Sequence, residues 1–236
     1  MKKLLKKLAL LPLFCGLVLT SACSNDDENG NDIPTSWFDG TITATVVNGN
    51  DYNDLIRRIV ALCVENNEEI ASGTWLNGGF SITLPATLPN DMLFSLYEEA
   101  GAGVIISNRD AKIIETVAFL AFDSEGHNVG VLIYGDLEIM VAFTYADRDV
   151  TVTGGFTNDD FGFSFSVTHN VSLKRGWNKV FGTERTTETG IEVSTSTQPI
   201  NGLRWHFVEE NYDGFSAPMA TKNTTQSRSI FSRLGI

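Results

Sequence analysis

The sequence predicts an all-β protein, built as one or more antiparallel β-sandwiches or as a partly closed barrel, with at most one or two short helices. Short apolar runs recur along the chain with alternating polar residues, and clusters of Asn, Gly and Asp separate them. The composition agrees with this pattern. Charged residues make up only 19% of the 236 residues, whereas threonine, which favours strands, occurs 23 times.

The first 22 residues are predicted to be a signal peptide that is removed. Four lysines lie within the first seven residues, and the apolar stretch Leu8–Thr20 follows them. A helix that spans a bilayer needs roughly 20 apolar residues, so this stretch is too short to serve as one. Removal of the four lysines leaves 13 basic residues against 29 acidic ones, a net charge of −16.

The end of this segment, Ser21-Ala22-Cys23, resembles the lipobox of bacterial lipoproteins, in which the signal peptidase cuts before a diacylated cysteine. Thr20 stands where the lipobox usually has leucine. The resemblance implies that Cys23 is lipidated and anchors the chain in the cell outer membrane. An ordinary secretory signal cut after Ala22 is the alternative.

An acidic stretch follows the cysteine, with Ser24, Asp26, Asp27 and Glu28. It resembles the tether of surface-exposed lipoproteins of the Bacteroides group, where such a run acts as an export signal, and this resemblance implies that the protein faces the exterior. The alternative is that the acidic residues have no export role, because charge keeps any linker solvated and extended. We expect residues 23–36 to form a lipidated cysteine followed by a disordered tether.

The charge and the cysteines restrict the partners of the mature chain. A net charge of −16 without a Lys/Arg cluster along a groove excludes nucleic-acid binding and makes an anionic membrane surface a poor partner for the body. Membrane attachment is therefore expected through the lipid alone. Once Cys15 has been removed and Cys23 lipidated, Cys63 has no cysteine left to pair with, and its apolar surroundings predict a buried, inert thiol.

Residues 37–216 are expected to form the β body, either as one domain or as two halves, 37–146 and 147–216. The run Leu55–Val64 fits both a strand and a helical face, and the strand is favoured. Asn77-Gly78-Gly79 predicts a hairpin turn, and Asp91–Glu99 is a candidate short helix. The other predicted strands are Thr41–Val47, Ile70–Thr74, Phe80–Leu84, Val104–Ser107, Val117–Phe122, Val129–Tyr134, Leu137–Tyr145, Val150–Phe156, Phe161–Val171, Trp177–Phe181, Ile191–Thr197 and Leu203–Val208.

The most regular alternation lies in Phe161–Val171, which is predicted to turn its odd-numbered residues, including Phe163 and Phe165, toward the core. The polar tail 217–236 either docks on the body through a short C-terminal helix or remains frayed.

The hairpin region resembles a known kind of module. Ile70–Pro85, with its strand, Asn-Gly turn and second strand, is similar to transthyretin-like β-sandwich modules appended to bacterial surface proteins. These modules are mostly non-catalytic, so the resemblance implies a sandwich and transfers no functional residues.

The sequence carries no pattern of a metal centre or an enzyme. His127, His169 and His206 lack metal-ligand spacing, and no C-x-x-C, G-x-S-x-G, Walker or GxGxxG motif is present. The paired acidic residues are adjacent in sequence, so on strands they would point to opposite faces rather than across a cleft. We therefore expect no cofactor, no metal and no catalytic residues, with a glycan hydrolase as the less supported alternative.

One basic cluster stands out in the acidic body. Trp177 is flanked by Lys174, Arg175 and Lys179, which combine a flat apolar ring with donors suited to an acidic or hydroxyl-rich partner. The competing interpretation is a core tryptophan at the start of a strand. The sequence thus predicts a surface-anchored, non-catalytic lipoprotein that binds a glycan or a protein partner. A structural or accessory component of a cell-envelope or pilus assembly is the alternative.

Overall fold

The computed structural model describes residues 37–64, 66–100, 102–114, 117–136, 138–160 and 163–209. Within these ranges the chain is almost entirely β, and helical residues are confined to two 3-10 turns and the single turn α2. The predicted all-β fold is confirmed. The elements are β1 (Trp37–Phe38), β2 (Thr41–Thr45), a 3-10 turn (Gly49–Tyr52), β3 (Arg58–Cys63), β4 (Glu69–Leu76), β5 (Gly79–Thr83), a 3-10 turn (Asn90–Met92), β6 (Phe94–Ser95), α2 (Leu96–Glu99), β7 (Val104–Ile106), β8 (Lys112–Ile114), β9 (Val117–Phe122), β10 (Asn128–Gly135), β11 (Ile139–Ala146), β12 (Val150–Asp160), β13 (Phe163–Leu173), β14 (Gly176–Thr186), β15 (Gly190–Ser196) and β16 (Arg204–Glu209).

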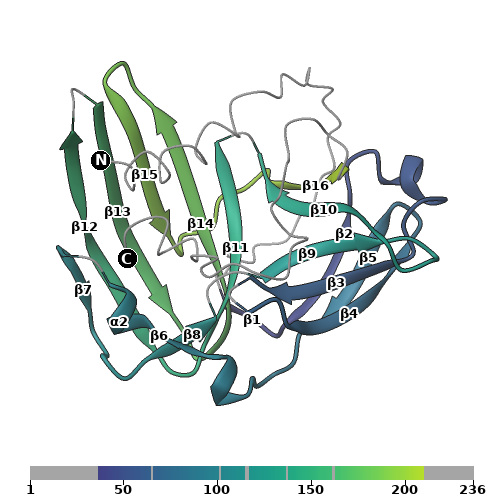
Figure 1. The fold of residues 1–236 in the computed structure, drawn as a ribbon, viewed down its shortest axis with the longest axis horizontal. Coiled ribbons are helices and arrows are strands. Elements are labelled where there is room, and N and C mark those ends of the chain that lie inside the picture. The colour runs from purple at the N-terminus through teal and green to yellow at the C-terminus, as the bar shows by residue number, and fades with distance from the viewer. Residues whose placement is uncertain are drawn as a thin grey trace.

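All strands belong to one connected sheet. Its main path runs β2-β5-β4-β3-β9-β10-β11-β14-β15-β13-β12-β7, while β1 adds to β14, β16 to β10, and β8 to β11 with β6 beside it. The strands at the two ends of this path run in different directions, with β12 to β15 steep and β2 to β5 nearly crosswise (Figure 1). The path crosses the boundary between residues 146 and 147, because β11 pairs with β14 along its length.

The predicted hairpin is confirmed in detail. Asn77 and Gly78 both have positive φ, +51° and +76°, and lie between the paired residues Leu76 and Gly79. Two central residues with positive φ define the type I′ turn that an Asn-Gly pair favours. The ambiguous run Leu55–Val64 contains strand β3, as favoured. Cys63 at the end of this strand is fully buried, as predicted.

Gly79 sits where β2, β4 and β5 meet, and we expect Gly79→Ala to destabilise the protein. A Cβ at this position would press against the backbone carbonyl oxygen of Ala44 on β2, so the two strands would have to separate. The expected cost is about 1–3 kcal/mol of unfolding free energy, measured by denaturant titration. Gly182→Ala is the matched control, because its nearest neighbour, the carbonyl oxygen of Met140, lies at an ordinary 3.6 Å. Equal losses in the two variants would contradict the packing at Gly79.

One strand pair departs from the antiparallel expectation. β15 lies between β13 and β14 and runs parallel to β13 (Figure 1). β13 and β14 are joined by a short turn yet splay apart, and the buried side chain of Asn178 holds the base of the splay. Its Oδ1 accepts from the Lys174 N–H at 2.9 Å, and its Nδ2 donates to the carbonyls of Lys174 and Gly176. β15 then fills the open end.

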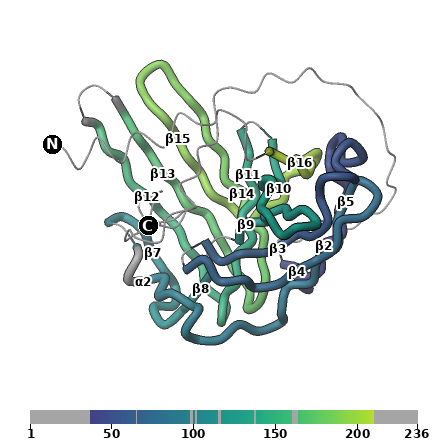
Figure 2. Tube along the Cα trace, turned by 45° about the vertical axis from the view of Figure 1, so that its right-hand side comes forward, coloured from purple at the N-terminus to yellow at the C-terminus, as the bar shows by residue number. Residues whose placement is uncertain are grey.

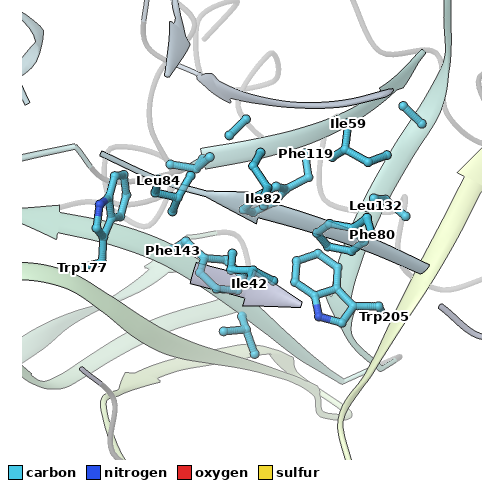
Figure 3. Packing of buried hydrophobic residues seen from close by; sticks show 14 of the residues in the cluster. Ile42, Ile59, Phe80, Ile82, Leu84, Phe119, Leu132, Phe143, Trp177 and Trp205 are labelled. Carbon is cyan, nitrogen blue, oxygen red and sulfur yellow. The ribbon is translucent and has the colours of Figure 1, made fainter. Parts of the chain in front are cut away.

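The main core is a cluster of aromatic and aliphatic side chains from the part of the sheet path that runs from β2 to β14, together with β8 and β16 (Figure 3). Trp205 packs against several rings of this cluster, with the ring centroids of Phe80, Phe119 and Phe143 at 4.9, 5.3 and 5.6 Å. Such ring pairs stabilise beyond the area they bury. A second, aliphatic cluster that includes Val152, Val171 and Leu173 packs between the long strands at the other end.

Strand β13 shows the predicted two faces from Val167 to Leu173, whereas Phe165, predicted to face the core, is only half-buried, as are Ser164 and Ser166. Val167, His169 and Val171 are buried, whereas Thr168 and Asn170 are exposed. The predicted inward residues Phe161 and Phe163 lie where no side chain is described. The tube trace shows β13 beside β12 and β15 (Figure 2).

The residues predicted to form the signal peptide and the tether lie outside the described part of the chain. These are Cys23, Ser24, Asp26, Asp27 and Glu28, together with the rest of residues 1–36, and the same holds for the tail 217–236. Among the described residues, no helix has the length and apolar character needed to cross a membrane.

Candidate functional site

Trp177, the centre of the predicted binding cluster, is a core residue. Its side chain is only 2% exposed, its Nε1 donates to the carbonyl oxygen of Pro85 at 2.8 Å, and its ring meets Tyr145 edge to face at 5.4 Å. Figure 3 shows Trp177 at one end of the packed cluster and Trp205 at the other. The ring therefore offers no exposed stacking platform, and the core interpretation of this tryptophan is the correct one.

The cations around Trp177 do not form one surface. Lys174 Nζ pairs with Asp149 Oδ2 at 2.9 Å, and the backbone N–H of Arg175 donates to Asp149 Oδ1 at 2.9 Å. The Arg175 N–H first, and the Lys174 ammonium second, hold the pKa of Asp149 below its usual range. These contacts tie the turn between β13 and β14 to Asp149, which precedes β12, so Lys174 and the Arg175 backbone serve the fold at this point.

Lys179 lies in different surroundings. It shares a face of β14 with Trp177 and Phe181, because residues two apart on a strand point the same way. Its Nζ lies over the rings of Phe38 and Tyr134, 5.5 and 5.9 Å from their centroids. Burial lowers the pKa of Lys179, since the charged form loses part of its hydration. The two rings partly compensate by a cation–π attraction.

Lys179 forms part of the lining of a groove of about 770 Å³ beside strand β2. The side formed by β2 and the residues after it runs from Thr41 to Asn48. We call this hollow the β2 groove. Its other lining residues are Phe38, Tyr134, Phe143, Lys179, Leu203, Arg204 and Trp205.

The backbone of β2 is paired on one side only over most of its length. Leu84 N–H donates to the Gly40 carbonyl at 2.9 Å and Val46 N–H to the Gly78 carbonyl at 3.0 Å, so even-numbered residues bond to the β5 side. In an antiparallel ladder the intervening residues direct their N–H and C=O groups the other way. Thr41, Thr43 and Thr45 therefore turn their backbone groups toward the groove.

Two contacts mark the limits of this open edge. At one end the Thr41 N–H is taken by Asp39 Oδ1 at 2.8 Å, and at the other the Val47 N–H donates to the Trp205 carbonyl at 2.8 Å. Between them, β2 has no strand on its second side among the described residues, because its only ladder is with β5. The middle of the edge, at Thr43, is open to a partner.

The groove carries positive charge without a matching carboxylate. Arg58, Arg148, Lys174 and Arg185 each lie within 4 Å of an acidic side chain. In the described chain Lys179 and Arg204 form no ion pair, a property they share with Arg57, Arg109, Lys112 and Arg175, but no acidic residue lines the groove. Lys179 and Arg204 both line the groove. In a chain with a net charge of −12, two cations in one hollow without acidic partners favour an anionic group of a ligand.

The histidines form no site together. His169 is 2% exposed and its Nδ1 lies 2.8 Å from Thr195 Oγ1, while His127 lies on the surface beside Asp123. His206 is half-buried on β16, and burial first, then the Arg204 charge, lowers its pKa. Within the described ranges, no group of three or more His, Cys, Asp or Glu is arranged to hold a metal ion.

Searches of protein-family models, curated proteins and solved structures find no match to this chain. Of the predicted binding residues, the structure brings only Lys179 into the groove. The sequence analysis did not predict Arg204 or the β2 edge as parts of a site, because the two segments are far apart in the chain. The alternating threonines at 41, 43 and 45 were the only local signal, and they indicate an exposed strand face.

Proposed function

We propose that this protein is a non-catalytic lipoprotein, anchored by lipidated Cys23 on the outer face of the cell outer membrane, whose β2 groove binds a glycan or a protein partner. The observation that supports binding is the groove itself, where Lys179 and Arg204 stand without acidic partners beside an open strand edge. The lipobox-like residues and the acidic tether support the anchor.

The anchor is tested by Cys23→Ala. Without the thiol no lipid can be attached, so we expect the variant to leave the membrane fraction or to accumulate unprocessed, while wild-type protein fractionates with outer membranes. Mass spectrometry of the wild-type N-terminal peptide should show acylation of Cys23. A soluble wild-type protein without acyl mass on Cys23 would contradict the anchor.

Exposure at the surface is a separate matter. Replacing Asp26, Asp27 and Glu28 together with alanine should protect the lipidated protein from protease added to intact cells. Unchanged cleavage would refute the export role of the tether.

Binding is tested with the mature chain starting at Ser24, screened on a glycan array and against a phage library of random dodecapeptides. The proposal requires a ligand that binds wild type and is lost when Lys179 and Arg204 are both replaced, by Met and Ala respectively. Lys174→Met is the matched control, because Lys174 pairs with Asp149 away from the groove. Ligands that bind the double variant as tightly as wild type would show that binding occurs elsewhere and would refute a groove site.

A further inference from the structure

The open edge of β2 decides which class of ligand fits the groove best. The backbone groups at Thr43 are directed into the groove, and strand β2 ends at Thr45, just before the contact of Val47 with Trp205. An edge of five residues spans about 17 Å at 3.4 Å per residue, the length that a short extended peptide covers. Addition of a strand to an open sheet edge is a recurrent mode of peptide recognition.

The aromatic residues of the groove are poorly placed for a sugar. Stacking on a sugar ring needs an open aromatic face, yet Phe143 and Trp205 are 2% and 7% exposed. The half-buried rings of Phe38 and Tyr134 have the Lys179 ammonium over them. The groove thus offers backbone hydrogen bonds and positive charge rather than a stacking platform.

The positive charges of Lys179 and Arg204 favour a peptide with an acidic side chain. The Lys179 ammonium is half-buried, and charge-assisted hydrogen bonds to such a group are stronger than neutral ones. Arg204 supplies a second, exposed cation in the same groove. Because a strand directs alternate side chains to one face, an added strand would present every second side chain to the groove that Lys179 and Arg204 line.

We infer that the β2 groove receives an extended segment of a protein partner as an additional strand on β2, with an Asp or Glu side chain of that segment held by Lys179 and Arg204. The inference rests on the proposed binding function and names its ligand class. In this arrangement the backbone of Thr43 forms hydrogen bonds with the peptide and provides affinity, and the two cations select for an acidic side chain.

The experiment uses the dodecapeptide library on the mature chain, followed by calorimetry with the enriched peptides and with copies in which each Asp or Glu is changed to its amide. We expect enriched peptides to carry an acid at a fixed position, and its amide to bind about tenfold or more weakly. Equal affinity of acid and amide copies would overturn the inference.

The strand edge is tested by Thr43→Pro, which removes the N–H facing the groove and leaves the β5 ladder intact. Binding should fall at least about tenfold in Thr43→Pro. As a test that needs no variant, the Thr43 amide of wild type should exchange more slowly with solvent when peptide is bound. Unprotected Thr43, or peptides that bind Thr43→Pro as tightly as wild type, would overturn strand addition.

Three further outcomes distinguish this inference from the broader proposal. An acidic glycan that needs Lys179 but binds Thr43→Pro normally overturns the peptide inference and leaves groove binding intact. Peptides that bind only after removal of residues 210–236 would show that the chain's own C-terminal segment is the occupant, which also overturns the inference. Peptide binding unaffected by replacement of both Lys179 and Arg204 overturns the groove site altogether.

Discussion

Trp177→Ala is expected to lower the free energy of unfolding by about 3–5 kcal/mol, a large part of a typical total of about 5–15 kcal/mol. The variant would leave a cavity between β14 and the Tyr145 ring, and it would remove the donor to the Pro85 carbonyl. Denaturant unfolding followed by far-UV circular dichroism measures the loss.

Trp37→Ala is the matched control for this prediction. The Trp37 side chain is 48% exposed, so its truncation removes far less buried surface and should cost under about 1 kcal/mol. If Trp177→Ala lowered the free energy of unfolding as little as Trp37→Ala, Trp177 would not be a core residue, and an exposed stacking platform would be supported instead.

The second large effect is a loss of stability in mild acid that depends on His169. Burial lowers the pKa of His169 from 6.5 to about 4, because the charged ring would lose its hydration. Between these values the unfolded chain binds a proton that the folded chain does not, so stability falls as the pH falls. A difference of about 2.5 pKa units corresponds to roughly 3 kcal/mol, fully present above pH 6.5 and lost by about pH 4.

Unfolding titrations of wild type and His169→Gln at a series of pH values isolate this effect. Acidic residues such as Asp149 and Asp123, whose pKa values are held low by backbone N–H donors, also cost stability in acid, but mainly below pH 4 and in both proteins. The stability difference between wild type and His169→Gln should therefore shrink between pH 6.5 and 4. A constant difference for His169→Gln would contradict burial of a neutral ring.

Local patterns explain which parts of the fold could be predicted. Alternation places strand β9 at Val117–Phe122, because a half-buried strand needs one apolar face at every second residue. The Asn77-Gly78 turn was predictable for a local reason too, since both residues tolerate positive φ. The insertion of β15 between β13 and β14 was not, because it depends on the buried Asn178 holding a splayed turn, a tertiary contact that leaves no periodic signal.

In the candidate site, too, local sequence predicts some features, whereas others depend on how the strands are arranged. Lys174, Arg175, Trp177 and Lys179 are close in sequence, but the turn at Gly176 leaves the first two outside the strand that carries the last two. Trp177 then faces the core, and Lys179 on the same face emerges beside Phe38. The cation that accompanies Lys179 in the groove, Arg204, lies on a strand that joins the sheet through β10. Proximity of this kind comes from strand order and has no counterpart in local sequence.

The most direct test of groove binding is a pair of calorimetric titrations with the tightest ligand from the array or the library. Lys179→Met should weaken that ligand by about tenfold or more, whereas Lys174→Met should bind like wild type, because both variants lose one positive charge and only Lys179 lies in the β2 groove. Equal weakening in the two variants would mean that net charge alone controls binding, and unchanged affinity in Lys179→Met would mean that the ligand lies elsewhere. Either result would contradict the assignment of the groove as the binding site.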